Sequence, residues 1–410
     1  MLDNVPFEIQ EEIIKHLPVK SLIRFRSVSK SWKSLVDSSD FITHYRSQQQ
    51  HLLVYIRRYG SEPKYVSIVD DNTFPEQRVS PTLPLFVKML NPCRTIGSSH
   101  GLLCLYDYGE LVIWNPLITK AVPVVVPNFV DDKMFKTEFG FGVCRETSDP
   151  KIVKIRYIYR FTDMESVTSI PWQVEVYTLS TGVWRSPNSN VPRKPIVFGV
   201  QKGGVCVDGV YYWLATDKSI VDDEIVDDEI EAYNMIISFD MTSEEFREVN
   251  LPDSFVYDGP MWNLYIYNLR ESLVLVERGT EEDYTPVYKV WMMEDGVRKS
   301  FTKLYTIHAP YARIIGVREF KKSGELVMEV REDGRNAISL VVYEPNLKHI
   351  SNLGISRGTG DIYVHSYMET LLLLDQPLST IFDKQMDFES YKQVIKLDGK
   401  WSLVVKMVLV

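Results

Sequence analysis

A tandem acidic duplication is the segment of this 410-residue chain whose residue types and spacing most directly suggest chemistry. Between Ile220 and Ile230, the run Asp222-Asp223-Glu224 is repeated as Asp227-Asp228-Glu229. Dense carboxylate oxygens can ligate Ca²⁺, but the segment has no central glycine and no terminal glutamate at the spacing of an EF-hand loop. We therefore expect a solvated loop between two strands; attraction of a basic substrate is the alternative interpretation.

Other patterns with catalytic potential are incomplete. Ser99 stands beside His100, but no G-x-S-x-G turn accompanies them, and adjacent residues cannot form a triad alone, so we expect a turn there. The glycines at 140–142 and 203–204 precede no helix pattern and form no phosphate-binding loop. None of the seven His pairs with a second ligand at i, i+4. We predict no catalytic residue, no metal site and no cofactor.

Charge is distributed unevenly along the chain. The 46 Lys and Arg against 55 Asp and Glu give a formal charge of −9. Residues 1–50 hold seven basic and six acidic side chains, so they carry +1 and the remaining residues carry −10. An acidic body argues against a broad nucleic-acid-binding surface. The composition, 45% apolar and 25% charged, is that of a globular protein and excludes a wholly disordered chain.

The cysteines and the apolar runs bear on location. The four cysteines are scattered and form no C-x-x-C pair, which favours reduced, partly buried thiols in an intracellular protein: Cys93, Cys104, Cys144 and Cys206. The first residues lack the basic and apolar regions of a signal peptide. No apolar run approaches the roughly 18 residues of a membrane span. We expect a protein of the cytoplasm, the nucleus or both, with no membrane partner.

Residues 6–37 predict three short helices. Ile9, Ile13 and Leu17 recur at a four-residue spacing, and Pro18 ends the first helix. The second covers about 19–26, and the third starts near Ser27 or Ser29, either of which is a suitable N-cap. Three helices this short cannot bury all of their apolar side chains against one another. The surplus either docks on the rest of the chain or faces a second protein, and composition leaves both alternatives open.

These helices resemble a plant F-box. The resemblance rests on Val5-Pro6, Glu8-Ile9 and the nearly continuous run from Ile13 to Leu35, although the family usually opens with Leu-Pro. It implies that residues 1–45 bind a Skp-type adaptor, which bridges to a cullin and its RING partner. The positions that the resemblance assigns to adaptor binding are Pro6, Ile9, Ile13, Leu17, Pro18, Leu22, Val28 and Trp32.

Beyond residue 50 the apolar periodicity changes from 3.6 to 2, which predicts many short strands. A unit of strand, polar turn and second strand recurs, and its aromatic residues lie 63, 62, 52 and 52 residues apart: Trp114, Tyr177, Phe239, Trp291 and Tyr343. A sixth unit precedes them at 66–70, and strands at 391–395 and 401–405 are candidates to close the ring. The repeat favours a six-bladed β-propeller over a Greek-key sandwich.

This body resembles a plant F-box-associated interaction domain, a kelch-like β-propeller. The residues that carry the resemblance are 99–104, 113–116, 208–214, 237–240, 290–292 and 301–305, with Phe301 where the family more often has Trp. The predicted fold is thus α+β and multidomain: a small three-helix F-box at 1–45, then an all-β propeller of six blades at 50–410. The resemblance implies a module that binds a protein substrate and names no substrate.

Three functions follow as hypotheses. The first is a non-catalytic substrate adaptor of a Skp–cullin–F-box ubiquitin ligase, and the second is an F-box scaffold acting outside a ligase. The third is a propeller that binds a small ligand or a glycan. For substrate contact we predict aromatic residues that lie in or near long connections, because loops carry recognition and Trp and Tyr dominate binding energy: Trp172, Tyr257, Trp262, Tyr265 and Tyr267. Packing between blades is the alternative role for each of them.

Overall fold

The computed structural model describes most of the chain to residue 376. The described residues are 6–45, 47, 49–57, 62–90, 94–107, 109–127, 134–159, 171–188, 190–192, 194, 196–199, 203–217, 233–252, 255, 263–280, 285–294, 300–308, 313–331, 337–358 and 360–376. Among these residues, none of the helices has the length and apolar character needed to cross a membrane.

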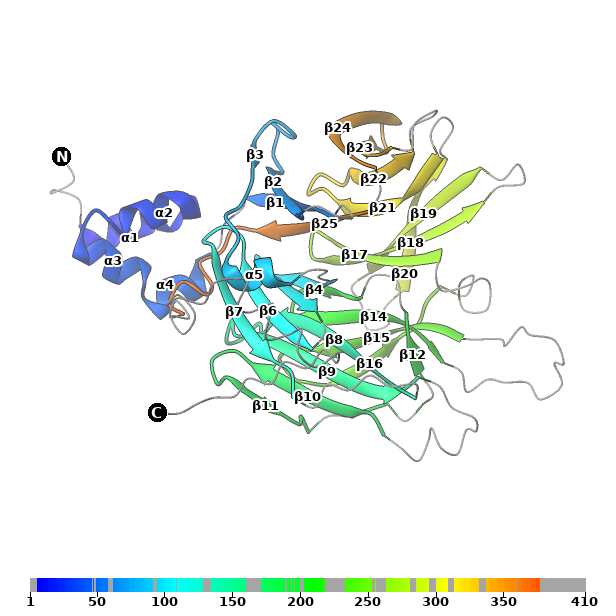
Figure 1. The fold of residues 1–410 in the computed structure, drawn as a ribbon, viewed down its shortest axis with the longest axis horizontal. Coiled ribbons are helices and arrows are strands. Elements are labelled where there is room, and N and C mark those ends of the chain that lie inside the picture. Colours follow the sequence, from blue (N-terminus) through cyan, green and yellow to red (C-terminus); the bar gives the residue numbers. More distant parts are fainter. Residues whose placement is uncertain are drawn as a thin grey trace. The chain divides into compact units, whose positions relative to one another are not determined.

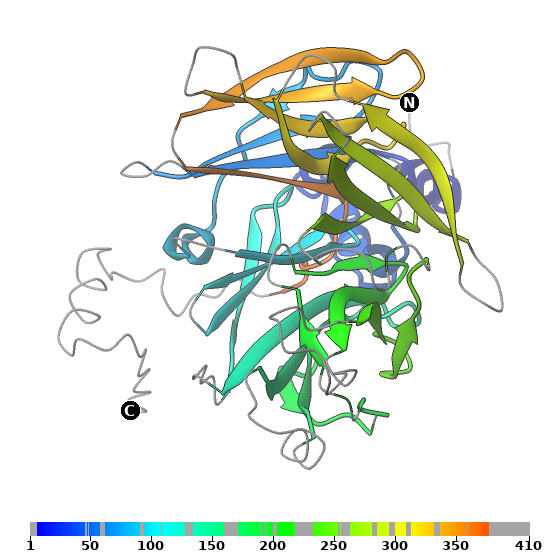
Figure 2. The ribbon, with the colours of Figure 1, turned by 90° about the vertical axis from the view of Figure 1, so that its right-hand side faces the viewer.

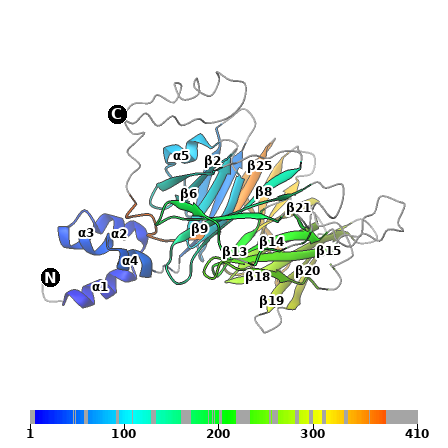
Figure 3. The same cartoon turned by 90° about the horizontal axis from the view of Figure 1, so that it is seen from below.

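The N-terminal helices form a head of four short elements (Figure 1, Figure 3). The three predicted helices are α1 (Phe7–Lys15), α2 (Val19–Phe25) and α3 (Lys30–Val36), and a fourth, α4 (Ser39–His44), was not predicted. Ser29 and not Ser27 caps α3, since its hydroxyl accepts a hydrogen bond of 3.2 Å from the backbone N–H of Trp32. Ser38 caps α4 in the same way, through the N–H of Phe41.

Six antiparallel sheets follow, which we name blades A to F (Figure 1). Blade A contains β25 (Asp361–Met368), β1 (Gln50–Arg57), β2 (Lys64–Val69) and β3 (Arg78–Val79). Blade B contains β4 (Arg94–Ser99), β5 (Leu102–Asp107), β6 (Glu110–Asn115) and β7 (Lys120–Val125). Blade C contains β8 (Phe135–Val143), β9 (Pro150–Ile158), β10 (Gln173–Thr178) and β11 (Val183–Arg185). A short helix, α5 (Leu85–Met89), lies between blades A and B in the sequence.

Of the remaining three blades, blades E and F have the same four-stranded meander and blade D has five strands. Blade D contains β12 (Ile196–Phe198) and β13 (Val205–Val207), which both pair with β14 (Val210–Asp217), then β15 (Tyr233–Asp240) and β16 (Phe246–Val249). Blade E contains β17 (Leu264–Leu269), β18 (Ser272–Thr280), β19 (Pro286–Glu294) and β20 (Ser300–His308). Blade F contains β21 (Arg313–Phe320), β22 (Leu326–Arg331), β23 (Ile338–Glu344) and β24 (His349–Arg357).

The blades close into a ring, which Figure 2 shows from the side opposite the head. The first strands of successive blades are neighbours, from β25 through β4, β8, β13, β17 and β21 back to β25. Blade A joins the two ends of the ring, because β1 pairs antiparallel with β25, with Gln50 opposite Met368 and Arg57 opposite Asp361. β25 therefore makes the closure that we predicted for 391–395 and 401–405, and those two segments lie outside the described residues.

The repeated aromatic residues fill the boundaries between blades. Each boundary has its own buried core, so the ring contains six. The repeat residues all lie on the third strand of a blade and enter the core shared with the preceding blade: Trp114, Tyr177, Phe239, Trp291 and Tyr343, with Ile68 in blade A. The predicted sixth unit is thus β2, and the repeat is confirmed as the signature of six blades.

Strand direction divides the connections between two faces of the ring. The chain enters β1 from the head and leaves β25 towards it, so turns between first and second strands, and between third and fourth, lie on the head's side (Figure 1). The second strands end and the third strands begin on the opposite face. The turn at Asp208-Gly209, predicted from sequence, is on the head's side, with φ values of +42° and +68°.

Candidate functional site

One side of the head presents apolar side chains to solvent. Ile9 and Ile13 lie one turn apart on α1 and are 53% and 55% exposed, and Val28, between α2 and α3, is 68% exposed. Pro6 and Pro18, which precede α1 and α2, are exposed as well. An exposed apolar surface on short, capped helices is a surface suited to a second protein.

The other predicted adaptor contacts belong to the interior of the head. Leu22 is fully buried, and Leu17 and Trp32 are partly buried against the same core. The rings of Phe25 and Trp32 lie 5.9 Å apart. The guanidinium of Arg26 donates to both carboxylate oxygens of Asp37, which connects the end of α2 to the end of α3. These contacts hold the helices in the arrangement that leaves Ile9, Ile13 and Val28 exposed.

Another part of the head is covered by the protein's own chain. Its core, which includes Ile14 and Val36, contains Leu371 and Leu374 from the segment after β25. Leu117 and Ile118, from the turn after β6, pack against the same core. Of the two alternatives left open by composition, docking on the rest of the chain is therefore confirmed for this part of the head. The part that contains Ile9, Ile13 and Val28 remains exposed, and its contact with a second protein stays a prediction.

The prediction that loop aromatics are available to a substrate is wrong for Trp172 and Tyr267. Trp172 is 8% exposed and lies against Phe198 and Phe246 in the core between blades C and D. Tyr267 lies on β17, is 4% exposed, and donates a hydrogen bond of 2.8 Å to the carbonyl of Val317. The reason is geometric: a blade is radial, so both faces of its strands meet neighbouring blades, and large rings fill the space between them.

The remaining residues of the propeller that were considered as candidate sites, apart from His100, are either partly buried, buried or outside the described residues. Tyr265 lies on β17, not in a loop, and is partly buried against the core between blades E and F. Tyr257, Trp262 and the acidic duplication at 220–230 lie outside the described residues. Ser99 is 7% exposed and accepts a hydrogen bond of 3.2 Å from the backbone N–H of Val143. Its contact of 3.1 Å with the exposed His100 belongs to the turn between β4 and β5, and a turn was predicted here.

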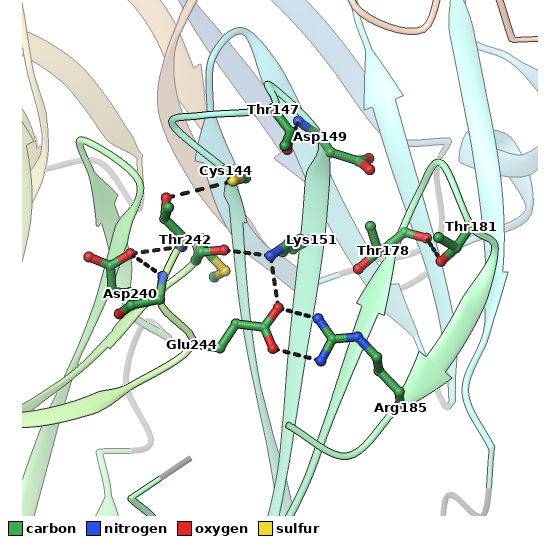
Figure 4. Close-up of polar contacts among 12 residues, drawn as sticks. Cys144, Thr147, Asp149, Lys151, Thr178, Thr181, Arg185, Asp240, Thr242 and Glu244 are labelled. Atoms are coloured by element: carbon green, nitrogen blue, oxygen red, sulfur yellow. Dashed lines mark hydrogen bonds and ion pairs between the residues drawn. The ribbon is translucent and has the colours of Figure 1, made fainter. Parts of the chain in front are cut away.

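A polar cluster crosses the boundary between blades C and D (Figure 4). Lys151 on β9 donates to Glu244 and to the carbonyl of Met241, both at 2.8 Å, and the guanidinium of Arg185 donates to both oxygens of Glu244. Both cations, Lys151 and Arg185, pair with Glu244, which is the pattern of a structural ion-pair network. Within the described residues, no three His, Cys, Asp or Glu side chains come together in a way that could hold a metal ion.

The cysteines of the described part of the chain are free and buried, as predicted for Cys104, Cys144 and Cys206. Burial raises the pKa of Cys206 to about 11. Burial also acts to raise the pKa of Cys144, but its hydrogen bonds with Thr147 and Thr242 outweigh burial and the net pKa is lowered. Cys93 lies outside the described residues.

A four-helix head with an exposed apolar side, attached to a closed six-bladed propeller, defines the class of an F-box protein with a propeller body. Residues 2–44 match the F-box domain, and residues 81–372 match the F-box associated beta propeller domain. The chain belongs to the family of proteins with this propeller domain.

Relatives of similar length support this membership. An F-box/kelch-repeat protein of Arabidopsis thaliana is 26% identical over 74% of this chain and 79% of its own. The F-box protein CPR1 of the same plant is 25% identical over 75% of this chain and 74% of its own. A third Arabidopsis thaliana F-box protein is 26% identical over 79% of this chain and 76% of its own.

Proposed function

We propose that this protein is the substrate-recognition subunit of a Skp–cullin–F-box ubiquitin ligase. The F-box head docks a Skp-type adaptor, and the propeller captures a protein substrate. The observation that carries the proposal is the exposed apolar surface of the head at Ile9, Ile13 and Val28, on a domain whose core is otherwise covered by its own chain. F-box proteins generally act in such ligases.

The protein contributes position and not a catalytic group. A subunit that holds a substrate beside a ubiquitin-carrying enzyme raises the effective concentration of the acceptor lysine, which converts an encounter into a nearly intramolecular transfer. The arrangement of connections supports capture on the face opposite the head. On that face β9 ends at Ile158 and β10 begins at Gln173, and β14 ends at Asp217 and β15 begins at Tyr233, so each pair of strand ends is separated by more than ten residues of sequence.

Co-purification tests the proposal. Tagged full-length protein, recovered from plant cells, is expected to bring down a Skp-type adaptor and a cullin, and the Ile9→Ala plus Ile13→Ala variant is expected to lose both. Val125→Ala, which truncates an apolar side chain of the propeller that is 77% exposed, is the matched control. Recovery of adaptor without cullin would favour a scaffold outside a ligase, and recovery of neither would refute the proposal.

Location belongs to the same proposal. We place the protein in the cytoplasm, the nucleus or both, where a cullin ligase acts. A fluorescent fusion of the full chain checks this, and a signal confined to a membrane-bound organelle would contradict it.

A further inference from the structure

Residues 369–374 follow β25 and contribute side chains both to the core of the head and to the propeller. We call these residues the connector segment. Leu371 is fully buried and Leu374 is 6% exposed, and both pack in the core of the head. Leu373, between them in sequence, is 3% exposed and packs instead in the core between blades B and C. The connector segment is therefore an integral part of two cores and not a tether between them.

Asn115, the last residue of β6, fixes the backbone of the connector segment. Its amide nitrogen donates hydrogen bonds to the carbonyls of Thr370 and Leu372, at 3.0 and 2.9 Å. Its amide oxygen accepts from the backbone N–H groups of Leu117 and Ile118, at 3.0 and 3.4 Å. Because Asn115 is fully buried, each of these bonds forms away from competing water.

Glu369 joins the propeller to the first turn of α2. One carboxylate oxygen accepts a hydrogen bond of 3.0 Å from the backbone N–H of Val19, and the other lies 3.3 Å from Nε2 of His51 on β1. The first N–H groups of a helix have no partner within it, and α2 begins after Pro18, which offers no side-chain cap. Glu369 supplies this missing cap from 350 residues away in sequence.

Tyr45 adds a contact between the end of α4 and the start of α2. Its hydroxyl donates a hydrogen bond of 2.7 Å to the carbonyl of Leu17. Burial, followed by the nearby charge of Glu369, raises the pKa of Tyr45 to about 12, so the phenol remains a donor at neutral pH. The hydrogen bonds of Glu369 and Tyr45 therefore meet at the junction of α1 and α2.

The backbone of the connector segment is packed too closely to shift freely. At Gly101, in the turn between β4 and β5, a Cβ atom would lie 2.2 Å from the carbonyl oxygen of Met368 and 2.7 Å from the side chain of Thr370. Leu373 has a φ of +75°, a conformation that a leucine rarely adopts and that surrounding contacts must hold. Both features indicate that the path of the connector segment is set by its neighbours.

We propose that the connector segment is a positioning element that holds the F-box in one orientation on the propeller, with Asn115 and Glu369 as its positioning residues. It keeps the adaptor-binding side of the head at a fixed distance and angle from the opposite face of the ring. The role that we assign to this rigidity rests on the proposed function, since a ligase must present its substrate at a set distance. The inference that the connection is rigid does not rest on the proposed function.

Distance measurement between two spin labels on the full-length protein tests the proposal. One label is attached to a cysteine that replaces Lys33 on α3, and the other to a cysteine that replaces Val183 on β11; both positions are exposed. The background carries Cys93→Ser, and its remaining native cysteines, Cys104, Cys144 and Cys206, are buried. We expect one narrow distance distribution in the parent. Asn115→Asp with Glu369→Ala is expected to widen it at least twofold. Asn115→Asp retains the oxygen that accepts from the β6–β7 turn but removes both donors to the connector segment.

Two further variants separate positioning from general stability. Glu369→Gln retains an oxygen that can accept from Val19 and is expected to restore the narrow distribution. Glu344→Ala is the control, because Glu344 ends β23 as Asn115 ends β6 but contacts no part of the connector segment. A broad distribution in the parent, or a narrow one in Asn115→Asp with Glu369→Ala, would overturn the proposal.

Hydrogen exchange provides a readout that does not require a change at Asn115. Glu369→Ala alone is expected to speed exchange of the Val19 amide about tenfold or more and to leave the amides of α3 unchanged; an unchanged Val19 amide would overturn the proposal. Adaptor affinity is expected to stay within about twofold in every connector variant. The Ile9→Ala plus Ile13→Ala variant is expected to lose adaptor binding and to keep a narrow distance distribution. Its adaptor binding tests the proposed function, and its distance distribution tests the connector segment.

Discussion

The Nζ atom of Lys151 on β9 lies 2.8 Å from a carboxylate oxygen of Glu244, which belongs to the next blade, and both side chains are about nine-tenths buried. Arg185 donates to the same carboxylate from β11 (Figure 4). One acidic residue of blade D thus receives two cations of blade C. Removing a single partner from such a buried pair leaves an uncompensated charge, which costs far more than the intact pair contributes.

Substitution of Glu244 is expected to destabilise the propeller. Glu244→Gln leaves Lys151 and Arg185 without a counter-charge, and we expect the free energy of unfolding to fall by about 3 kcal/mol. Glu245→Gln is the matched control, since Glu245 is about half exposed and pairs only with Arg247 on the surface; its effect should stay below about 0.5 kcal/mol. Urea denaturation measures both, and equal effects would contradict a structural role for the cluster.

The contribution of Glu244 should also depend on pH. Burial alone would raise the pKa of its carboxyl, but hydrogen bonds from Arg185 and Lys151 outweigh burial and hold the pKa below its ordinary value of 4.5. A carboxyl whose pKa is lowered on folding stabilises the folded state above its unfolded pKa and loses that effect as pH falls through the folded one. The stability difference between parent and Glu244→Gln should therefore be full at pH 6 and shrink below about pH 4.

Two glycines with similar backbone conformations should respond differently to alanine. Gly182→Ala, at φ +67° with no atom within 4 Å of the new Cβ, is expected to cost about 1 kcal/mol from backbone strain. Gly101→Ala, at φ +80°, adds clashes with the carbonyl of Met368 on β25 and with the side chain of Thr370 in the connector segment, and we expect a further cost of about 1–3 kcal/mol from overpacking. Thermal unfolding of both variants gives the comparison, and equal costs would show that the connector segment is not closely packed against the turn.

The repeat aromatics should be the most sensitive positions of the ring. Trp114 is fully buried between blades A and B, so Trp114→Ala is expected to cost about 3–5 kcal/mol. Leu347→Ala, at a position that is 71% exposed, should change stability by less than about 0.5 kcal/mol. If chemical denaturation gave similar values for the two variants, Trp114 could not be a core residue between blades.

Periodicity made the blade architecture predictable, because each blade must bury an aromatic or large aliphatic residue at the same register position. Trp114, Tyr177 and Phe239 appear in sequence as equivalent residues for that reason. The same packing rule misled the prediction of substrate contacts. Trp172 and Tyr267 lie outside the repeat and look like loop residues, yet a radial sheet buries rings on both of its faces.

The union of head and propeller was not predictable from sequence, because it depends on contacts between distant segments. Glu369 is an ordinary acidic residue in the sequence, and only the fold places it against Val19 and His51. Asn115 was part of a family resemblance, but its four hydrogen bonds to two different segments follow from tertiary structure alone. The fourth helix was missed because the predicted pattern ended at residue 37, before Phe41 and Ile42, which enter the core of the head.

Calorimetric titration of the full-length protein with a recombinant plant Skp-type adaptor tests the central claim most directly. Ile9→Ala plus Ile13→Ala removes exposed apolar area and keeps good helix formers, so α1 should persist while the affinity falls about 100-fold. Val125→Ala, on the propeller, should bind like the parent. An unchanged affinity in the double variant, or no binding by the parent, would contradict the assignment of this side of the head to the adaptor.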